Sequence, residues 1–438
     1  MHCFASLRVT AAVWISALAL APALAAAPCP DLPAADAAAL VLATALDRVA
    51  DCHPDVRAAR SAWAGAAADV QVAGQLPNPQ LTLGAGSVGS PLGSGTLWSK
   101  TFDHSVRVDQ LIERGNKPAL RRAAAQAALD AAWADLAEAR RRAMAAVAQV
   151  HQDLWAAQSR RAQLQGEVAL SDQSLRLLDQ RVRAGDAPAL DAARFRLDDA
   201  RLRAELRQSD ADGQDLQRQL ASLIGAGAAA NLLQARPADL VAVPALADAA
   251  AQADALERRG DVVAALARVR AAESLRGVAA AGRIRDVTVG VQLDHWPTSP
   301  ANASGTGNTL SLSVSVPLFV RHANDGELAR AEADLSTARE AMARVRRSAR
   351  DDLERALAQV QAATERRRLV LEQLEPAAGL VSAGAELAYR RGASSALDVL
   401  DARRNLHAVR IERIAADAEL AKALAAWRMA SLPVEALP

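Results

Sequence analysis

Two aspartates near the C-terminus, Asp398 and Asp401, have a spacing suited to electrostatic chemistry. Residues three positions apart share one face of a helix, so both carboxylates project from the same side. Repeated around a symmetric pore, the pair would form two carboxylate rings, which favour cations and repel anions. The alternative is a solvated acidic face. The spacing suits charge selection rather than catalysis, and the family resemblance given below favours the rings.

The histidines predict no catalytic or metal centre, because they are scattered and form no HExxH-like motif. His295 and His322 flank the second predicted strand pair and could contact metal ions, although solvated loop histidines are the commoner case. We therefore predict no enzyme, no cofactor and no bound metal. The complete set is His2, His53, His104, His151, His295, His322 and His407.

The composition excludes several classes of protein. Of the 438 residues, 51% are apolar but only 3% are aromatic, and alanine supplies most of the apolar fraction. Alanine, leucine, arginine and glutamate are strong helix formers. The chain therefore predicts long, closely packed helices rather than a compact enzyme around a bulky core. The 51 Lys and Arg residues balance 50 Asp and Glu residues, which argues against nucleic-acid binding.

The N-terminal residues 1–25 have the pattern of a secretory signal peptide. Arg8 supplies the positive charge, Val9–Leu20 the apolar segment and Ala23–Ala25 a small-residue cleavage site. The alternative is a membrane anchor, but the apolar run is short for a membrane span. No later apolar stretch is long enough to span a membrane as a helix. The sequence therefore predicts export.

Two cysteines remain in the mature chain, Cys29 and Cys52. In an oxidising periplasm they can form a structural disulfide. A thiolate metal site is the less favoured alternative, because metal-binding cysteines are usually spaced more closely. Lipid modification of Cys29 is also disfavoured, since Pro28 occupies the position where a small residue is needed.

The mature chain consists of two copies of one unit of about 200 residues. Pro54–Ala59 reappears 206 positions later as Gly260–Ala265, and the same offset carries Leu81–Gly84 onto Val287–Gly290. We therefore predict an N-terminal periplasmic segment (26–52), repeat 1 (53–235), an inter-repeat linker or helix (236–258), repeat 2 (259–432) and a C-terminal tail (433–438). Each repeat should have two strands and then a helical hairpin: near 80–89, near 103–112 and over 117–224 in repeat 1; near 286–294, near 308–319 and over 325–432 in repeat 2.

The predicted strands are amphipathic. Leu310–Val316 is apolar at every second position, which gives a strand one apolar and one polar face. In an exported chain, this alternation is typical of transmembrane β-barrels. Four strands cannot close a barrel, so several chains must contribute. A periplasmic coiled coil with two small β-hairpins is the alternative, but it leaves the alternation unexplained.

On this duplicated frame the chain resembles the TolC-like outer-membrane efflux proteins, the outer membrane factors. The residues that carry the resemblance are Gly74–Pro79, Val108–Glu113 followed by Lys117, Val316–Phe319 followed by Gly326 and Glu327, Tyr389–Gly392, and Ala396–Ala402. It implies a mainly α fold with a small transmembrane β part, in which three chains form a 12-stranded β-barrel continued by a periplasmic α-barrel. It also implies an outer-membrane location, outer-membrane lipid as surroundings, and as partners a homotrimer, a periplasmic membrane-fusion adaptor and an inner-membrane resistance-nodulation-division pump.

The resemblance also implies roles for residues near the second tip. Aspartates matching Asp398 and Asp401 line the periplasmic constriction, and the tyrosine matching Tyr389 helps to latch it closed. Ser394 replaces an arginine of the family pattern. Closure must therefore differ in this chain, or use Arg390 or Arg391.

The turns between the long helices are the predicted adaptor-docking end. Gly185 and Gly392 should end these helices with positive φ. Leu190 and Leu397 follow each turn and could offer an apolar contact to an adaptor helix. Ordinary packing between helices is the alternative for both leucines.

These features predict a passive exit duct of a tripartite efflux system. Val316–Phe319, with Arg321 and Asn324, resembles the cobalt–zinc–cadmium resistance branch, which favours heavy-metal cations as cargo. The alternatives are the outer-membrane duct of a type I protein secretion system and a periplasmic coiled-coil scaffold without a pore.

Overall fold

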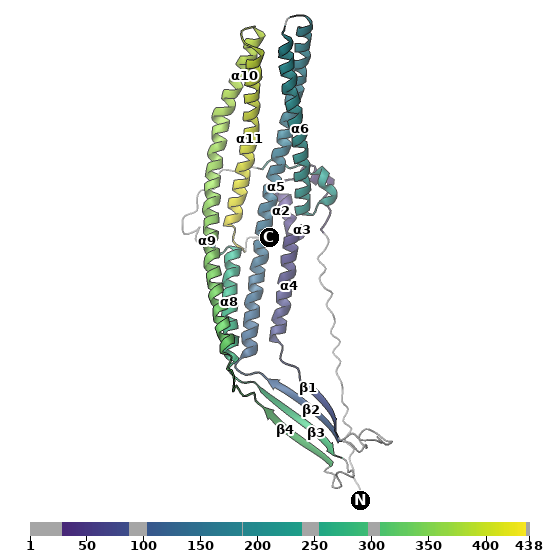
Figure 1. Ribbon diagram of the computed structural model, residues 1–438, viewed down its shortest axis with the longest axis vertical. Helices are drawn as coiled ribbons and strands as arrows, with labels where there is room; N and C mark the ends of the chain where they lie inside the picture. The colour runs from purple at the N-terminus through teal and green to yellow at the C-terminus, as the bar shows by residue number, and fades with distance from the viewer. Residues whose placement is uncertain (1–28, 87–102, 186, 239–253, 297–306, 435–438) are drawn as a thin grey trace, which may run out of the picture.

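The computed structural model describes residues 29–86, 103–185, 187–238, 254–296 and 307–434. The predicted signal peptide lies outside them. The molecule is long and narrow, with helical hairpins at one end and a four-stranded sheet at the other (Figure 1). No helix within the described ranges is both long and apolar enough to cross a membrane.

Repeat 1 supplies the longest helix of the described chain. Helix α4 (Pro54–Gly74) leads to the sheet, α5 (Lys117–Arg183) returns from it, and α6 (Ala189–Ile224) completes the hairpin. Pro54 suits a first helical turn, where its missing N–H would have no helical acceptor. Helix α6 ends where Gly225 adopts a φ of 66°.

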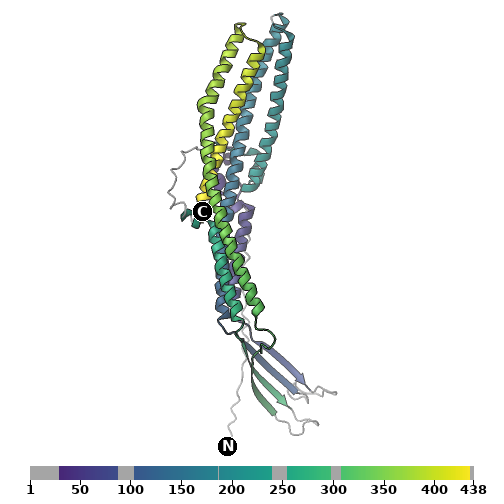
Figure 2. The same cartoon turned by 60° about the vertical axis from the view of Figure 1, so that its left-hand side comes forward.

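Repeat 2 follows the same order but breaks its long helix. Helix α8 (Gly260–Ala281) corresponds to α4; α9 (Asp325–Leu369), a π-turn η3 (Val370–Leu374) and α10 (Glu375–Arg390) together correspond to α5; and α11 (Ala396–Ser431) corresponds to α6. Pro376 cannot donate a hydrogen bond to the preceding turn, so it favours the π-turn at this place. The two hairpins run side by side in both views (Figures 1 and 2).

The four strands form one antiparallel sheet in the order β1-β2-β3-β4. They are β1 (Gln80–Gly86), β2 (Asp103–Ile112), β3 (Val287–Trp296) and β4 (Gly307–Ser315). Strand β4 ends at Ser315, so the prediction of a strand reaching 319 is wrong. Pro317 has no N–H for the ladder, and Phe319 lies beyond the strand, where the Arg285 guanidinium sits 5.5 Å from its ring centre.

The register gathers the apolar side chains on one face. Val106 of β2 pairs with Leu83 of β1 and Leu293 of β3, and Leu293 pairs in turn with Leu310 of β4. These side chains are exposed, to 70% for Leu83 and 73% for Leu310. The face comprises Leu81, Leu83, Ala85, Val106, Val108, Val287, Val289, Val291, Leu293, Leu310, Leu312 and Val314.

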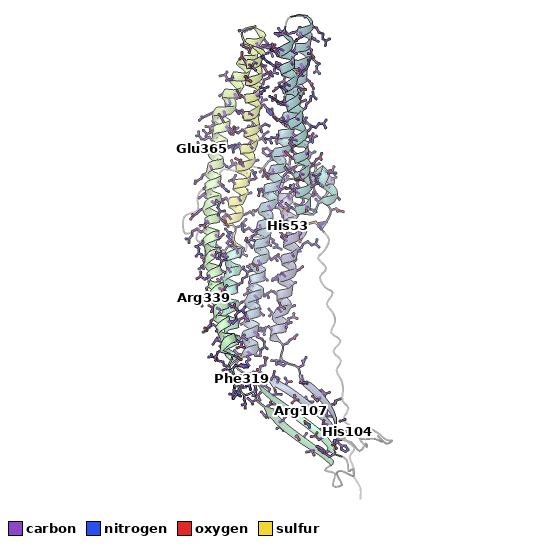
Figure 3. All side chains as sticks on the ribbon, viewed as in Figure 1. His53, His104, Arg107, Phe319, Arg339 and Glu365 are labelled. Atoms are coloured by element: carbon purple, nitrogen blue, oxygen red, sulfur yellow. A yellow bond between two sulfur atoms is a disulfide. The ribbon has the colours of Figure 1, made fainter. Side chains whose placement is uncertain are left out.

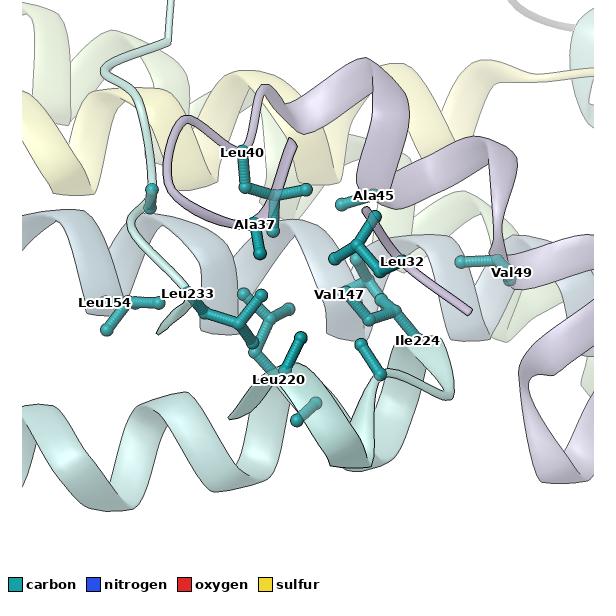
Figure 4. Packing of buried hydrophobic residues seen from close by; sticks show 14 of the residues in the cluster. Leu32, Ala37, Leu40, Ala45, Val49, Val147, Leu154, Leu220, Ile224 and Leu233 are labelled. Carbon is teal, nitrogen blue, oxygen red and sulfur yellow. The ribbon is translucent and has the colours of Figure 1, made fainter. Parts of the chain in front are cut away.

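The largest apolar core lies at mid-length, where the N-terminal segment packs on the first hairpin (Figure 4). Its short helices are α1 (Ala34–Ala37), α2 (Leu42–Asp47) and α3 (Val49–Cys52), with η2 (Gly227–Leu232) beside them. We call this cluster the hub; it comprises Leu32, Ala37, Leu40, Ala45, Val49, Val56, Leu136, Ala143, Val147, Leu154, Leu220, Ala221, Ile224, Ala226, Ala229, Leu233 and Ala235.

Polar contacts hold the N-terminal segment to the hub. Cys29 and Cys52 are joined by a disulfide. The Arg48 side chain donates to the carbonyl of Ile224 at 3.0 Å, at the end of α6. The buried His151 ring contacts the Leu40 carbonyl at 3.0 Å, and Leu40 forms a parallel bridge with Ala235. The N-terminal segment of the described chain is therefore tied to the first hairpin at several points.

Candidate functional site

The face of the sheet opposite the apolar side chains carries a polar network. Arg107 binds both carboxylate oxygens of Asp109, at 2.7 and 2.9 Å. It also contacts Ser313 at 3.2 Å and Gln292 at 3.4 Å. Gln292 donates to Asp294 at 2.7 Å. These contacts cross from β2 to β3 and β4, so both repeats build one hydrophilic surface (Figure 3).

A charged contact fixes this surface relative to the helices. Lys117, the first residue of α5, lies 2.8 Å from Asp286, the residue before β3. Burial tends to raise the pKa of Asp286, but the contacts with Lys117 and the Arg114 N–H lower it on balance. Asp286 therefore stays ionised and joins a helix of repeat 1 to a strand of repeat 2.

The tips of the hairpins have the predicted backbone. Gly185 and Gly392 adopt φ values of 81° and 76°, which confirms the positive φ expected at both turns. Leu190 is 61% exposed and Leu397 is 41% exposed. In the single chain both side chains are thus available at the surface.

Asp398 takes part in the start of α11. Its carboxylate accepts hydrogen bonds from the backbone N–H and the hydroxyl of Ser395, both at 2.8 Å, while the Ser395 hydroxyl accepts from the Asp398 N–H at 3.2 Å. This is a reciprocal capping box. The hydrogen bonds from Ser395 lower the pKa of Asp398. The side chain is exposed, so it carries a negative charge at the surface while it caps the helix.

Asp401 lies one turn further along α11 and is also exposed. Its carboxylate is 3.5 Å from Arg404. The structure thus places Asp398 and Asp401 near one another at the tip of the second hairpin, on a helix that starts beside the turn.

The three other predicted gating residues differ in their surroundings. Tyr389 is half-buried against a small apolar cluster that includes Leu178 and Phe195 of the first hairpin. Arg390 is 3.8 Å from Glu386 on its own helix, and Arg391 makes no ion pair within the described residues. Tyr389 therefore packs against the opposite hairpin.

Two arginines that the sequence did not single out connect the hairpins. Arg403 donates to Ser174 of α5 and to Glu386 of α10, each at 2.9 Å. Arg404 donates to Asp198 of α6 at 2.7 Å. The two residues follow Asp401 by less than one turn, but no sequence spacing shows which acidic groups on the other hairpin face them.

The predicted histidine pair is not brought together. His295 lies near the end of β3 that is remote from the helices, whereas His322 follows β4, whose last residue pairs near the helical end. Elsewhere in the described chain, no three His, Cys, Asp or Glu side chains are grouped so that they could hold a metal ion.

Comparison with known proteins identifies the family. The family model for outer membrane efflux proteins matches residues 45–226 and 251–430, one segment in each repeat. Among solved structures, a membrane protein from Pseudomonas aeruginosa is 21% identical with a TM-score of 0.76, covering 89% of this chain and 93% of that one. VceC from Vibrio cholerae is 20% identical with a TM-score of 0.72, covering 89% and 95%.

CusC is a third similar structure, described as forming a transmembrane channel. It is 18% identical with a TM-score of 0.75, and the match covers 89% of this chain and 91% of that one. These likenesses show the TolC-like fold. No curated protein matches the sequence. Since the family model matches both repeats, the chain belongs to the outer membrane efflux protein family, whose members are transport channels rather than enzymes.

Proposed function

We propose that three copies of this chain form a passive exit duct in the outer membrane, with a long periplasmic extension. The observation that carries the proposal is the two-faced sheet. Its apolar face is exposed in the single chain, and its other face carries the Arg107 network. Such a sheet fits a barrel wall between lipid and a water-filled lumen.

The edges of the sheet support the assembly. Strands β1 and β4 each pair on one side only, and open strand edges are unstable in lipid because their backbone groups lack partners. Edge-to-edge joining of three four-stranded sheets gives 12 strands and satisfies every edge. The helical hairpins then surround one continuous tunnel below the barrel.

At the far end, the tips of the hairpins are the proposed contact with a periplasmic membrane-fusion adaptor. The exposed Leu190 and Leu397, presented by the turns at Gly185 and Gly392, supply the apolar surface. The adaptor connects the duct to an inner-membrane resistance-nodulation-division pump. A type I protein secretion system is the second candidate, and the neighbouring genes distinguish it by encoding an ABC exporter and a secreted substrate.

At the tunnel entrance, we propose that Asp398 and Asp401 form two rings of three carboxylates that favour cations. Tyr389 packs the hairpins together there, with Arg390 and Arg391 at the surface beside it. The ion pair of Arg404 with Asp198 and the hydrogen bond of Arg403 to Ser174 support closure through these two arginines, in place of the arginine that Ser394 replaces. Heavy-metal cations are the proposed cargo, supported by these rings and by the sequence Val316–Phe319.

Conductance of the purified protein in planar bilayers tests the duct. We expect heat-modifiable trimers in outer-membrane fractions and discrete cation-selective channels. The double variant Asp398→Asn, Asp401→Asn removes both charges, and an asparagine can still cap α11. It should lower cation selectivity while trimers still form. Unchanged selectivity would contradict the rings, and a periplasmic monomer without conductance would support a scaffold instead.

A further inference from the structure

One glycine in the sheet leaves room for a charged pair to cross it. Asp109 of β2, Gly290 of β3 and Ser313 of β4 are directly opposite one another in the register. A Cβ atom on Gly290 would overlap the Asp109 carboxylate and lie 2.6 Å from the Ser313 hydroxyl. It would also lie 3.1 Å from the Arg107 guanidinium. Side chains from both neighbouring strands therefore occupy the space above this glycine.

Arg107 uses this space to lie along the sheet. It is opposite Gln292 in the register (Figure 3). Its guanidinium reaches past Gly290 to the Ser313 hydroxyl at 3.2 Å, while two of its nitrogens bind the Asp109 carboxylate at 2.7 and 2.9 Å. The Arg107 side chain is 37% exposed and that of Asp109 is 19% exposed. The pair is thus held against the wall of the sheet.

The pair also balances the charge of the polar face. Arg107 is the only lysine or arginine on the four described strands, and Asp109 cancels its charge at close range. Alternation along the strands places Asp294 on the same face, where its carboxylate accepts from the neutral amide of Gln292. Removing either member of the pair would therefore leave an unbalanced charge on this face.

We propose that Asp109 is a specificity-determining residue of the barrel. It neutralises Arg107 and, with the space at Gly290, keeps the guanidinium against the wall, so the lumen presents no ring of positive charge to a passing cation. This inference rests on the proposed duct, in which the polar face lines the lumen and each charge occurs three times around the pore. Rings of fixed charge select ions by sign. The pair is separate from the carboxylates of Asp398 and Asp401 at the hairpin tips.

Ion selectivity of the full-length trimer in planar bilayers tests the proposal. Reversal potentials are measured in KCl gradients near 0.01 M, where the Debye length is about 30 Å and wall charges act across the lumen. Asp109→Asn should shift the reversal potential towards that of chloride, and Arg107→Gln towards that of potassium. The double variant should return it to near the wild-type value, because both charges are gone. All shifts should shrink at about 1 M salt, where the Debye length is about 3 Å.

A pair of glycine variants tests the space above the sheet. Gly290→Ala should push the charged pair into the lumen and lower the single-channel conductance. Gly84→Ala is the matched control, because it adds the same methyl group to the polar face of β1, where the Ser105 side chain is its neighbour. It should lower the conductance less. Equal effects of the two variants would overturn the role of Gly290.

The outcomes separate the pair from the duct. Wild-type selectivity in channels of both Asp109→Asn and Arg107→Gln would overturn the proposal and leave the duct intact. Absence of channels from the wild-type protein would instead contradict the duct itself. A purely structural role of the pair would lower stability without shifts of opposite sign in the two single variants. Arg107→Gln gives an independent result if Asp109→Asn forms no trimers.

Discussion

His53 and Arg259 occupy equivalent positions in the two repeats, since the offset of 206 residues carries one onto the other. Both are buried, each beside the first residue of a helix. In repeat 1, Nδ1 of His53 accepts from the Asp55 N–H at 3.2 Å and caps α4. In repeat 2, Arg259 binds Asp261 at 2.9 and 3.0 Å, and Asp352 of α9 at 2.8 Å. One position is thus filled by a neutral cap and the other by an ion-pair network.

The hairpins differ in the size of their apolar cores, although arginine pairs join the helices in both. Repeat 1 is held at mid-length by the apolar hub. Repeat 2 has a smaller apolar cluster between α9 and α11, together with arginine pairs such as Arg366 with Glu419 at 2.7 Å and Arg367 with Asp417 at 2.6 Å. Burial tends to lower the pKa of Arg259, but its hydrogen bonds to Asp352 and Asp261 raise it on balance. At the position of His53 and Arg259, duplication has therefore preserved where the chain is stabilised but not the chemistry that stabilises it.

Removing a side chain from the hub should cause the largest loss of stability. Leu220 is fully buried, and Leu220→Ala should lower the free energy of unfolding by about 2–5 kcal/mol. Denaturant unfolding of the detergent-solubilised protein measures it. Leu197→Ala, on the exposed part of the same helix, should change stability by less than about 0.5 kcal/mol. Equal effects of the two variants would mean that the hub does not hold repeat 1.

Loss of the disulfide should cause the second-largest decrease in stability. Cys29→Ser with Cys52→Ser frees the N-terminal segment from the hub and should cost about 2–4 kcal/mol. The thermal midpoint gives the measurement. A reducing agent should lower the midpoint of the wild type and leave that of the double variant unchanged. If reduction has no effect on the wild type, the Arg48 and Leu40 contacts alone hold the segment.

The starts of the returning helices offer a smaller test. Asp398 is the third residue of α11 and forms a capping box with the N-cap residue Ser395, whereas its equivalent in repeat 1, Asp191, is the third residue of α6, which has no side-chain cap. Asp398→Ala should cost about 0.3–1.5 kcal/mol, Asp398→Asn much less, and Asp191→Ala less than Asp398→Ala. The thermal unfolding midpoints of the three variants measure these differences in stability. A larger loss in Asp191→Ala would remove this difference between the repeats.

Lowering the pH should cause the smallest loss of stability, confined to the surroundings of His53 and His151. Burial lowers the pKa of His53 and of His151 below 6.5, although Asp55 and the Leu40 carbonyl act in the opposite direction. The unfolded chain therefore takes up these protons first. The stability that the neutral rings provide is present above pH 6.5 and is lost as the pH falls towards their folded values.

Hydrogen exchange on either side of that pH locates the effect. After correction for the intrinsic exchange rate at each pH, the protection of amides in α4 and the hub should fall in acid, whereas that of α8, held by the arginine network, should not. His53→Asn keeps a capping acceptor without a titrating group and should reduce the response in α4. An equal loss of protection in α4 and α8 would contradict the contrast between the repeats.

Much of the fold follows from periodicity. Alternation at Leu310–Val316 indicated a strand, and the uninterrupted run after Lys117 indicated a long helix, because these patterns arise within one element. The strand end at Ser315 was also predictable from Pro317. The partners of Arg403 and Arg404 were not, because they depend on how two hairpins lie side by side. The reach of Arg107 past Gly290 to Ser313 depends on strand register across two repeats, which no local pattern encodes.

The pairing of β2 with β3 has a consequence for the order of folding. Arg107 and Gln292 make contact across 185 residues of sequence, and contacts of such separation form slowly. The β1–β2 hairpin alone is a marginal structure, and β3 becomes available only after more than half of the chain has been synthesised. The helical hairpin of repeat 1, built from local contacts, should therefore form first. The sheet should form last, after the strands of both repeats have been synthesised.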